Sequence, residues 1–147
     1  MAIQIKGYLF LDFDGVINIF NQHGKMSFPC LKAVSYLNKF INDTKLRVVI
    51  TSTWRYQGIR YCYEHLKKGG LDLPLELFDR TQTREVLARE EEIEQYLEKE
   101  GKLKFLVLDD AYLKISPTYF LRTDCHCGWN EEVDNKLRLM AKKIGLL

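Results

Sequence analysis

Residues 8–17 read Tyr-Leu-Phe-Leu-Asp-Phe-Asp-Gly-Val-Ile, an apolar run leading into two carboxylates that are separated by one residue and followed by glycine. Because side chains alternate across a strand, the side chains of Asp12 and Asp14 point to the same side, while Phe13 is free to point into a core. Gly15 supplies backbone freedom where the strand ends. Two carboxylates this close repel each other unless a cation or a shared proton lies between them, and their oxygens suit Mg²⁺. An acidic turn has the same short pattern, but the flanking apolar run and glycine favour a reaction centre.

Two further apolar runs also end in polar groups. The run 47–50 is followed by Thr51, and the run 105–108 is followed by Asp109 and Asp110. Carboxylates at the end of a buried strand must be paired or bind a metal. A threonine hydroxyl at such a position can hydrogen-bond a phosphoryl oxygen, although threonine is also common in strands for its propensity alone. Ser52 takes this role instead if the strand ends one residue later.

Strand-like and helix-like segments alternate along the chain. Because strands joined by helices form parallel sheets with right-handed crossovers, this order predicts an α/β fold, a three-layer sandwich with a mostly parallel sheet. Ligands of such sheets bind beyond the carboxyl ends of the strands, so we expect Asp12, Thr51 and Asp109 to converge on one pocket. The expected strands are 8–12, 46–51, 73–78, 104–108 and 118–121, and the expected helices are 31–42, 55–68, 83–100 and 131–144.

These motifs resemble those of the haloacid dehalogenase (HAD) superfamily of aspartate-nucleophile phosphatases. The first motif of the superfamily, a strand followed by D-x-D-G, matches residues 9–15, and the second, an apolar strand ending in Ser or Thr, matches residues 47–51. The fourth, an apolar strand ending in acids, matches residues 105–110. The second motif continues through Trp54 and Arg55, and an R-x-E-E-I run begins at Arg89. Both features resemble those of a compact, capless subgroup linked to nucleic-acid end repair. The resemblance implies a Rossmann-like HAD core in a single hydrolase domain, residues 1–147.

The resemblance also assigns roles to the acids. Asp12 is the expected nucleophile, forming an aspartyl-phosphate, and Asp14 is the expected general acid and base. Mg²⁺ is the expected cofactor, bound by Asp12, by Asp109 and by the backbone carbonyl of Asp14. Asp110 is expected to hold a metal-bound water or to orient another side chain. Aspartate at position 14 resembles the phosphatase branch of the superfamily, and phosphomutases share it.

The third motif departs from the family pattern, because the lysine expected before the fourth-motif strand is absent. A positive group is still needed to pair with the nucleophile and to share the charge of the transition state. Arg89 is the first candidate and Arg84 the second, while a surface arginine paired with a nearby glutamate is the alternative reading of Arg89. Substrate phosphate is expected to meet Thr51, Ser52 and Arg55, although Arg55 in this position also suits bracing of the loop.

The places where this superfamily inserts substrate-covering caps are short here. Between Asp14 and Thr51 there is room for a loop, residues 18–28, and one helix; between Thr51 and Arg89 there is room for a helix and a strand. We therefore expect an open site, with the 18–28 loop as the nearest lid, that accepts a phosphate on a macromolecule. The prediction is a Mg²⁺-dependent phosphomonoester hydrolase acting on a phosphorylated nucleic-acid end, a nucleotide or a phosphoprotein. The alternative is a non-catalytic phosphate-binding or interaction domain with a HAD fold, but such a domain has no use for the acid at Asp14.

Composition and charge are those of an ordinary globular domain. The 147 residues are 46% hydrophobic and 29% charged, with a net charge of +2, which is enough apolar material for one core. The segment 84–100 carries seven acids and three bases, so the remainder is mildly basic, which is compatible with phosphorylated ligands. No strong basic stripe of the kind that binds long nucleic acids is present.

The sequence also bears on compartment and partners. It contains no apolar run near the ~20 residues that span a bilayer and no leader-like segment, so we expect a cytoplasmic protein with no membrane partner. Nothing in the sequence indicates an oligomeric state. The four cysteines are expected to be reduced. Cys125 and Cys127 form a single tight pair, whereas structural zinc normally uses two, so we do not expect zinc there.

Overall fold

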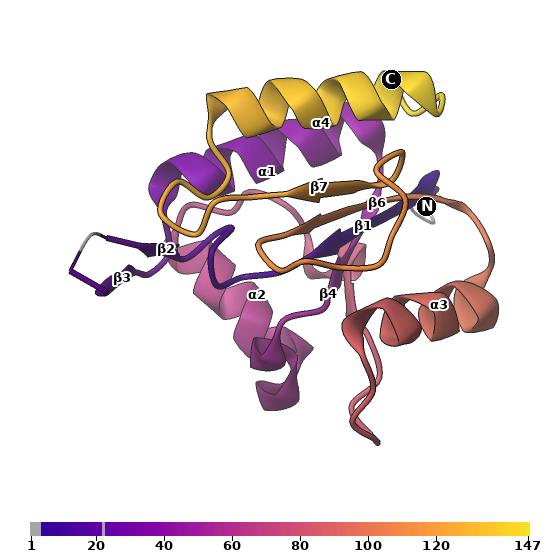
Figure 1. Cartoon of the computed structure of the whole chain (residues 1–147), viewed down its shortest axis with the longest axis horizontal. Helices are drawn as coiled ribbons and strands as arrows, with labels where there is room; N and C mark the ends of the chain where they lie inside the picture. The colour runs from indigo at the N-terminus through magenta and orange to yellow at the C-terminus, as the bar shows by residue number, and fades with distance from the viewer. Residues whose placement is uncertain (1–3, 22) are drawn as a thin grey trace.

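A computed structural model describes residues 4–21 and 23–147 of the chain. At its centre is a five-stranded sheet, in the order β5-β4-β1-β6-β7, in which every neighbouring pair is parallel (Figure 1). The first strand lies in the middle, with Leu9 paired to Val48 on one side and to Leu106 on the other. The strands are β1 (Gly7–Leu11), β4 (Arg47–Ile50), β5 (Phe78–Arg80), β6 (Lys104–Asp109) and β7 (Phe120–Arg122).

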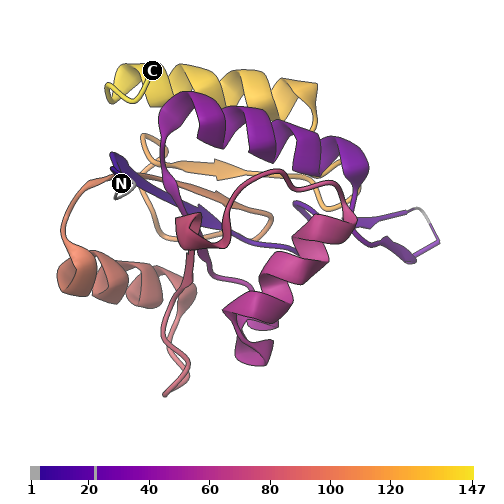
Figure 2. The same cartoon turned by 180° about the vertical axis from the view of Figure 1, so that it is seen from behind.

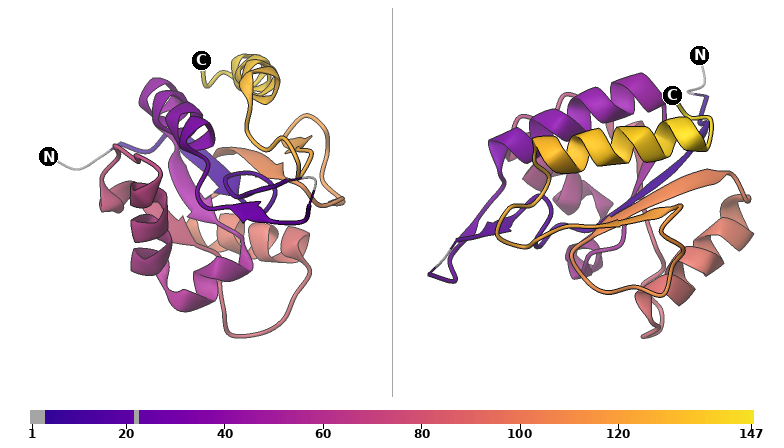
Figure 3. Two further views of the ribbon diagram at one scale, coloured as in Figure 1. Left: turned by 90° about the vertical axis from the view of Figure 1, so that its left-hand side faces the viewer. Right: turned by 45° about the horizontal axis from the view of Figure 1, so that its top comes forward.

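Helices cover both faces of the sheet. Two of them, α1 (Leu31–Thr44) and α4 (Glu131–Lys143), lie side by side over one face, and α3 (Arg89–Glu100) lies over the other (Figures 1 and 2). The helix α2 (Ile59–Lys68) contacts β5 and shares the core of α1. The left view of Figure 3 shows α1 and α4 above the strands and α3 below them. This is the three-layer arrangement that the sequence predicts.

Alternate residues of the central strands feed two separate cores. Leu9 and Leu11 of β1 join the larger core beneath α1 and α4, whereas Tyr8 and Phe10 join the smaller core beneath α3. The neighbouring strand β4 alternates in the same way, with Val49 in the smaller core. Because both faces of these strands are covered, the strands are apolar throughout, and the polar residues gather at their ends.

The structure confirms a parallel α/β sandwich with five strands, but the expected strand 73–78 is wrong in position. Residues Leu75–Leu77 form a short 3₁₀ helix, and β5 begins only at Phe78. Leu73 and Leu77 are apolar because they fill the larger core, where the chain returns from α2 to the sheet edge. The apolar pattern of this segment reflects the packing of a loop into the core and not the alternation of a strand.

Two expected helices are also shorter than the sequence indicates. The expected helix 83–100 begins only at Arg89, because the side-chain oxygen of Gln82 accepts from the backbone N–H groups of Arg84 and Glu85 and holds the preceding segment as a turn. The expected helix 55–68 is divided at Gly58, whose φ of 101° no helix tolerates. A 3₁₀ helix, Thr53–Gln57, precedes this glycine, and α2 follows it.

The described residues contain no large cap over the sheet edge. Between β1 and α1 the chain forms only a hairpin of two short strands, β2 (Ile19–Phe20) and β3 (Met26–Ser27). The expected lid, residues 18–28, corresponds to this hairpin, and Gln22 within it lies outside the described residues. Among residues 4–21 and 23–147, no helix has the length and apolar character needed to cross a bilayer.

Candidate active site

The three sequence motifs meet at one edge of the sheet. Asp12 follows β1, Thr51 follows β4, and Asp109 is the last residue of β6. The backbone N–H of Asp12 donates to the Leu108 carbonyl, and that of Thr51 donates to the Leu11 carbonyl, so the sheet hydrogen bonds continue up to the polar residues. All three polar side chains are buried. Their convergence follows from parallel strands that sit next to one another.

Asp12, Asp109 and Asp110 form a carboxylate cluster in which one oxygen of each lies within 4.8 Å of the others. Burial, together with the neighbouring Asp109, raises the pKa of Asp12 to about 8. Burial also raises the pKa of Asp110. A divalent cation relieves such repulsion, and carboxylate oxygens are the ligands that Mg²⁺ prefers. The three acids therefore fit the expected metal.

Arg89, the first residue of α3, reaches these acids. Its Nη1 lies 2.8 Å from Asp109 Oδ2 and 3.4 Å from Asp12 Oδ1. Arg84, the second candidate from the sequence, is exposed in the loop before α3, where its backbone N–H is bonded to Gln82. Of the two arginines, the structure brings Arg89 into the site and leaves Arg84 outside it.

Gly15 allows the two acidic segments to approach each other. It has a φ of +87°, a region that residues with a side chain rarely adopt. A Cβ atom at this position would lie 2.2 Å from Asp110 Oδ2, which is well inside contact distance. The glycine of D-x-D-G is therefore required both by the backbone turn and by the close approach of Asp110.

Asp14 has a different environment from Asp12. Its Oδ1 accepts hydrogen bonds from Asn18 Nδ2 at 3.0 Å and from Trp54 Nε1 at 3.1 Å. Its carboxylate is not a member of the cluster around Asp12, and sequence reasoning expected only its backbone carbonyl at the metal. Two neutral donors thus orient the carboxylate, an arrangement that suits proton transfer better than metal binding.

Asn18 and His65 were missed by sequence reasoning. Asn18 is fully buried between Asp14 and His65, with its Oδ1 2.7 Å from His65 Nε2. An amide oxygen can only accept, so His65 donates from Nε2. The D-G-x-x-N spacing from Asp14 is a weak signal for Asn18. The sequence carries no signal for His65, because tertiary packing alone brings α2 to the loop after β1.

Trp54 takes part in both the core and the site. Its half-buried ring packs against the larger core, and its centroid lies 4.3 Å from that of the His65 imidazole. The indole N–H is nonetheless directed to Asp14. A buried indole usually finds a hydrogen-bond acceptor, and here the acceptor is a candidate catalytic acid.

Thr51 and Ser52 are both buried after β4, but their hydroxyl groups are used differently. Ser52 Oγ accepts from the backbone N–H of Trp54 and caps the 3₁₀ helix. Thr51 Oγ1 is buried and has no hydrogen-bond partner among the described residues. Buried hydroxyls are normally bonded, so an unsatisfied one at the sheet edge fits an absent acceptor such as a phosphoryl oxygen.

Arg55 is enclosed by the protein. Its Nη2 lies 2.5 Å from Glu92 Oε2, and its Nη1 donates to the backbone carbonyls of Thr51 and Ser52. The side chain is only 3% exposed. This geometry supports the expected bracing of the loop, whereas a guanidinium held by these partners does not fit the expected contact with substrate phosphate.

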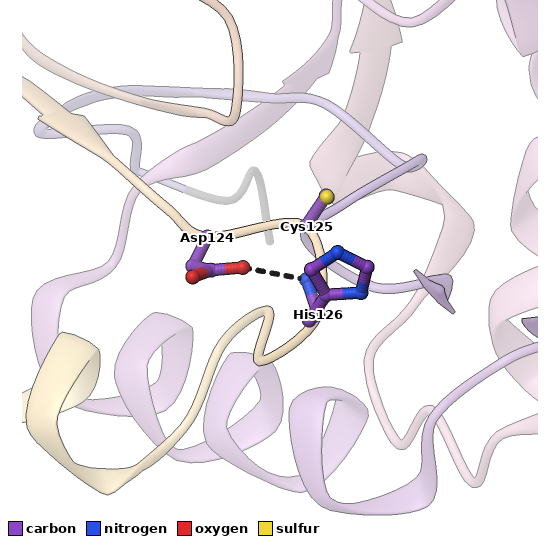
Figure 4. A group of neighbouring side chains, drawn as sticks. All are labelled: Asp124, Cys125 and His126. Atoms are coloured by element: carbon purple, nitrogen blue, oxygen red, sulfur yellow. Dashed lines mark hydrogen bonds between the residues drawn. The ribbon is translucent and has the colours of Figure 1, made fainter. Parts of the chain in front are cut away.

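A second group of metal-ligating side chains lies in the turn after β7. Asp124, Cys125 and His126 each offer one atom within 4.8 Å of the others (Figure 4). The Asp124 carboxylate accepts from the His126 backbone N–H, and His126 Nδ1 lies 2.9 Å from the carbonyl oxygen of Phe20. These bonds fix the turn against β2 and account for the grouping without a metal. All four cysteines, including Cys125, are free thiols.

Comparison with known proteins finds a family that covers most of the chain. The family model described as the HAD domain in Swiss Army Knife RNA repair proteins matches residues 8–133. No curated protein and no solved structure matches the chain. The matched region contains every acid of the carboxylate cluster, together with Thr51 and Arg89.

Proposed function

The chain belongs to the family of HAD domains in Swiss Army Knife RNA repair proteins, and on this premise we propose that it is a Mg²⁺-dependent phosphomonoester hydrolase with an aspartyl-phosphate intermediate. The family supports a phosphatase-like activity in general. The environments of the individual side chains support the finer assignment of roles.

Asp12 is the nucleophile in this proposal. One of its carboxylate oxygens attacks phosphorus, a bond forms between that oxygen and phosphorus, and the bond from phosphorus to the leaving oxygen breaks. Arg89 contacts both Asp12 and Asp109, so its charge favours the ionised nucleophile and faces the phosphoryl oxygens on which charge spreads. Asp12, Asp109 and Asp110 would hold Mg²⁺, which would supply further stabilisation of that charge.

Asp14 carries the proton in both halves of the reaction. Its carboxylic acid protonates the leaving oxygen in the first half, and the resulting carboxylate takes a proton from the water that attacks the aspartyl-phosphate in the second. Asn18 and Trp54 hold Oδ1, which leaves Oδ2 for the transfer. The hydroxyl of Thr51, which has no hydrogen-bond partner within residues 4–21 and 23–147, is available to a phosphoryl oxygen.

One observation carries the proposal: two acids that are separated by a single residue lie in different chemical environments. Asp12 lies among carboxylates and an arginine, as a metal-bound nucleophile requires, and Asp14 lies among neutral donors, as an acid and base requires. A domain that only bound phosphate would gain nothing from the second environment.

The substrate class in this proposal is a phosphorylated end of RNA or another nucleic acid. The family description names RNA repair proteins, and the absence of a large cap among the described residues leaves room for a polymer. Nucleotides and phosphoproteins are the competing substrates. The competing function is a non-catalytic phosphate-binding domain with the same fold.

The proposal is tested by phosphate release from p-nitrophenyl phosphate and from 5′- and 3′-phosphorylated oligonucleotides, with Mg²⁺ or with excess EDTA. We expect Mg²⁺-dependent release by the wild type and none by the Asp12→Asn variant. Phosphate that stays bound to the wild type after acid quenching during turnover would support the covalent step. The Asp12→Asn variant, which retains Asp14, should show no such acid-stable phosphate. Tight phosphate binding without any turnover would favour the non-catalytic domain.

A further inference from the structure

Tyr112 is the most exposed aromatic side chain among the described residues, with 84% of its surface accessible. It lies two residues beyond Asp110, in the loop after β6, and it belongs to neither core. The guanidinium of Arg122 lies over its ring, with Cζ 3.7 Å from the ring centroid. A tyrosine ring this exposed buries little apolar surface, so it contributes little to the stability of the core.

Arg122 fixes this pair beside the carboxylate cluster. It is the last residue of β7 and pairs in register with Asp109, so it lies at the same edge of the sheet as the acids. Its Nε donates to the backbone carbonyl of Asp110 at 2.9 Å. No carboxylate forms an ion pair with Arg122 within residues 4–21 and 23–147. The planar cation is therefore anchored at one nitrogen and stacked with one face on the Tyr112 ring.

A cavity of about 410 Å³ opens beside Arg122, between Asp110 and the turn after β7. It is lined by Asp110, Arg122, Thr123, Asp124 and Cys125. Figure 4 shows Asp124 and Cys125 on that turn, with one carboxylate oxygen of Asp124 directed toward the backbone nitrogen of His126. A space of this volume is of the size that small-molecule groups occupy in proteins.

We infer that Tyr112 and Arg122 form a stacking platform for a base of a single-stranded nucleic acid whose terminal phosphate is at Asp12. Unstacked bases bind on aromatic rings and on guanidinium planes, and here one of each is already stacked and exposed beside the acids. The cavity lined by Arg122 and Asp110 receives the nucleotide between the platform and the phosphate. The inference rests on the proposed function, because the acids define where the end of the strand lies.

The test compares substrates that reach the platform with substrates that do not. Tyr112→Ala should lower kcat/KM for a 3′- or 5′-phosphorylated oligonucleotide by about 5- to 150-fold, the range for removing one base–aromatic stack, mainly through KM. It should leave the turnover of p-nitrophenyl phosphate unchanged. Tyr112→Phe, which keeps the ring, should behave like the wild type. Leu139→Ala, which removes an exposed apolar side chain from α4, controls for non-specific effects of truncation.

The outcomes separate this inference from the proposed function. Equal kcat/KM of Tyr112→Ala and wild type on oligonucleotides, with p-nitrophenyl phosphate still hydrolysed, would overturn the platform and leave the phosphatase standing. If the wild type hydrolyses neither substrate, the proposed function fails, and oligonucleotide affinity by fluorescence anisotropy then decides: affinity unaffected by Tyr112→Ala overturns the platform as well. Dependence on Tyr112 for phosphopeptides but not for oligonucleotides would also overturn it.

Discussion

At the scale of single residues, Asp12 and Asp14 differ in what a change to the amide should do. Asp12→Asn keeps the shape but removes the nucleophile, so we expect no phosphate release above a mock preparation and an unchanged circular dichroism spectrum. Asp14→Asn should slow turnover by about 10²- to 10⁴-fold, the contribution typical of general acid–base catalysis. Steady-state rates on p-nitrophenyl phosphate measure both. An Asp14→Asn enzyme as fast as wild type would remove Asp14 from the mechanism.

Gly15 makes a second prediction at this scale. Gly15→Ala should destabilise the fold by about 1–3 kcal/mol, the usual cost of a residue held in a sparsely populated backbone region, and should also weaken Mg²⁺ binding, because the new Cβ displaces Asp110. Gly70→Ala is the matched control: Gly70 also has a positive φ, of 93°, but an added Cβ there meets no heavy atom within 4 Å. Urea unfolding with and without Mg²⁺ measures both variants. An equal cost at the two glycines, and equal Mg²⁺ stabilisation, would mean that contact with Asp110 is unimportant.

At the scale of secondary-structure elements, the central strands were predictable and the peripheral segments were not. The runs that became β1, β4 and β6 are apolar on both faces, so burial alone identifies them, and their polar ends locate Asp12, Thr51 and Asp109. The segment before β5 is apolar because it packs as a loop into the larger core, and the start of α3 depends on local hydrogen bonds. Nothing in hydrophobic periodicity reveals that Gln82 forms a turn before Arg89, or that α2 delivers His65 to Asn18.

The contact between α2 and the loop after β1 makes stability depend on pH. Burial lowers the pKa of His65, with Lys68 adding to the effect and Asp14 opposing it. The unfolded chain, with a histidine pKa of about 6.5, therefore binds a proton more readily than the folded chain. This contribution to stability is present above about pH 6.5 and is lost as the pH falls below that value.

We accordingly expect the free energy of unfolding at pH 5, relative to its value at pH 7.5, to be lower in wild type than in His65→Gln, which has no proton to gain. Urea denaturation at several pH values measures the two slopes. His126→Gln is the control, since His126 is exposed and lies outside this network. Parallel pH profiles for wild type and His65→Gln would show that His65 does not carry the effect.

At the scale of the whole molecule, Mg²⁺ should stabilise the fold as well as support activity. The carboxylate cluster brings together acids from the ends of β1 and β6, so a bound cation links two strands. Burial is the main cause of the raised pKa of Asp12, and the cation also offsets the repulsion by Asp109 that adds to it. We expect Tm to rise with Mg²⁺ by mass action and to return to its starting value with EDTA. Asp109→Asn should increase the Mg²⁺ concentration required, and Glu132→Gln, an exposed change on α4, should not. Full activity in excess EDTA would refute the metal assignment.

The open edge of the sheet predicts a preference for polymers. Contacts outside the pocket supply binding energy that a mononucleotide lacks, so kcat/KM should be higher for a phosphorylated oligonucleotide than for the same phosphate on its mononucleotide. Some of these contacts are with backbone phosphates. The preference for the oligonucleotide should therefore shrink as the salt concentration rises. Stacking of a base on Tyr112 depends much less on ionic strength, so a residual preference should persist at physiological ionic strength in wild type and be smaller in Tyr112→Ala. Measurements at low and at physiological ionic strength separate the two contributions. Equal values for oligonucleotide and mononucleotide at both salt concentrations would reject the nucleic-acid end as substrate and favour a small phosphorylated molecule, covered by the β2–β3 hairpin.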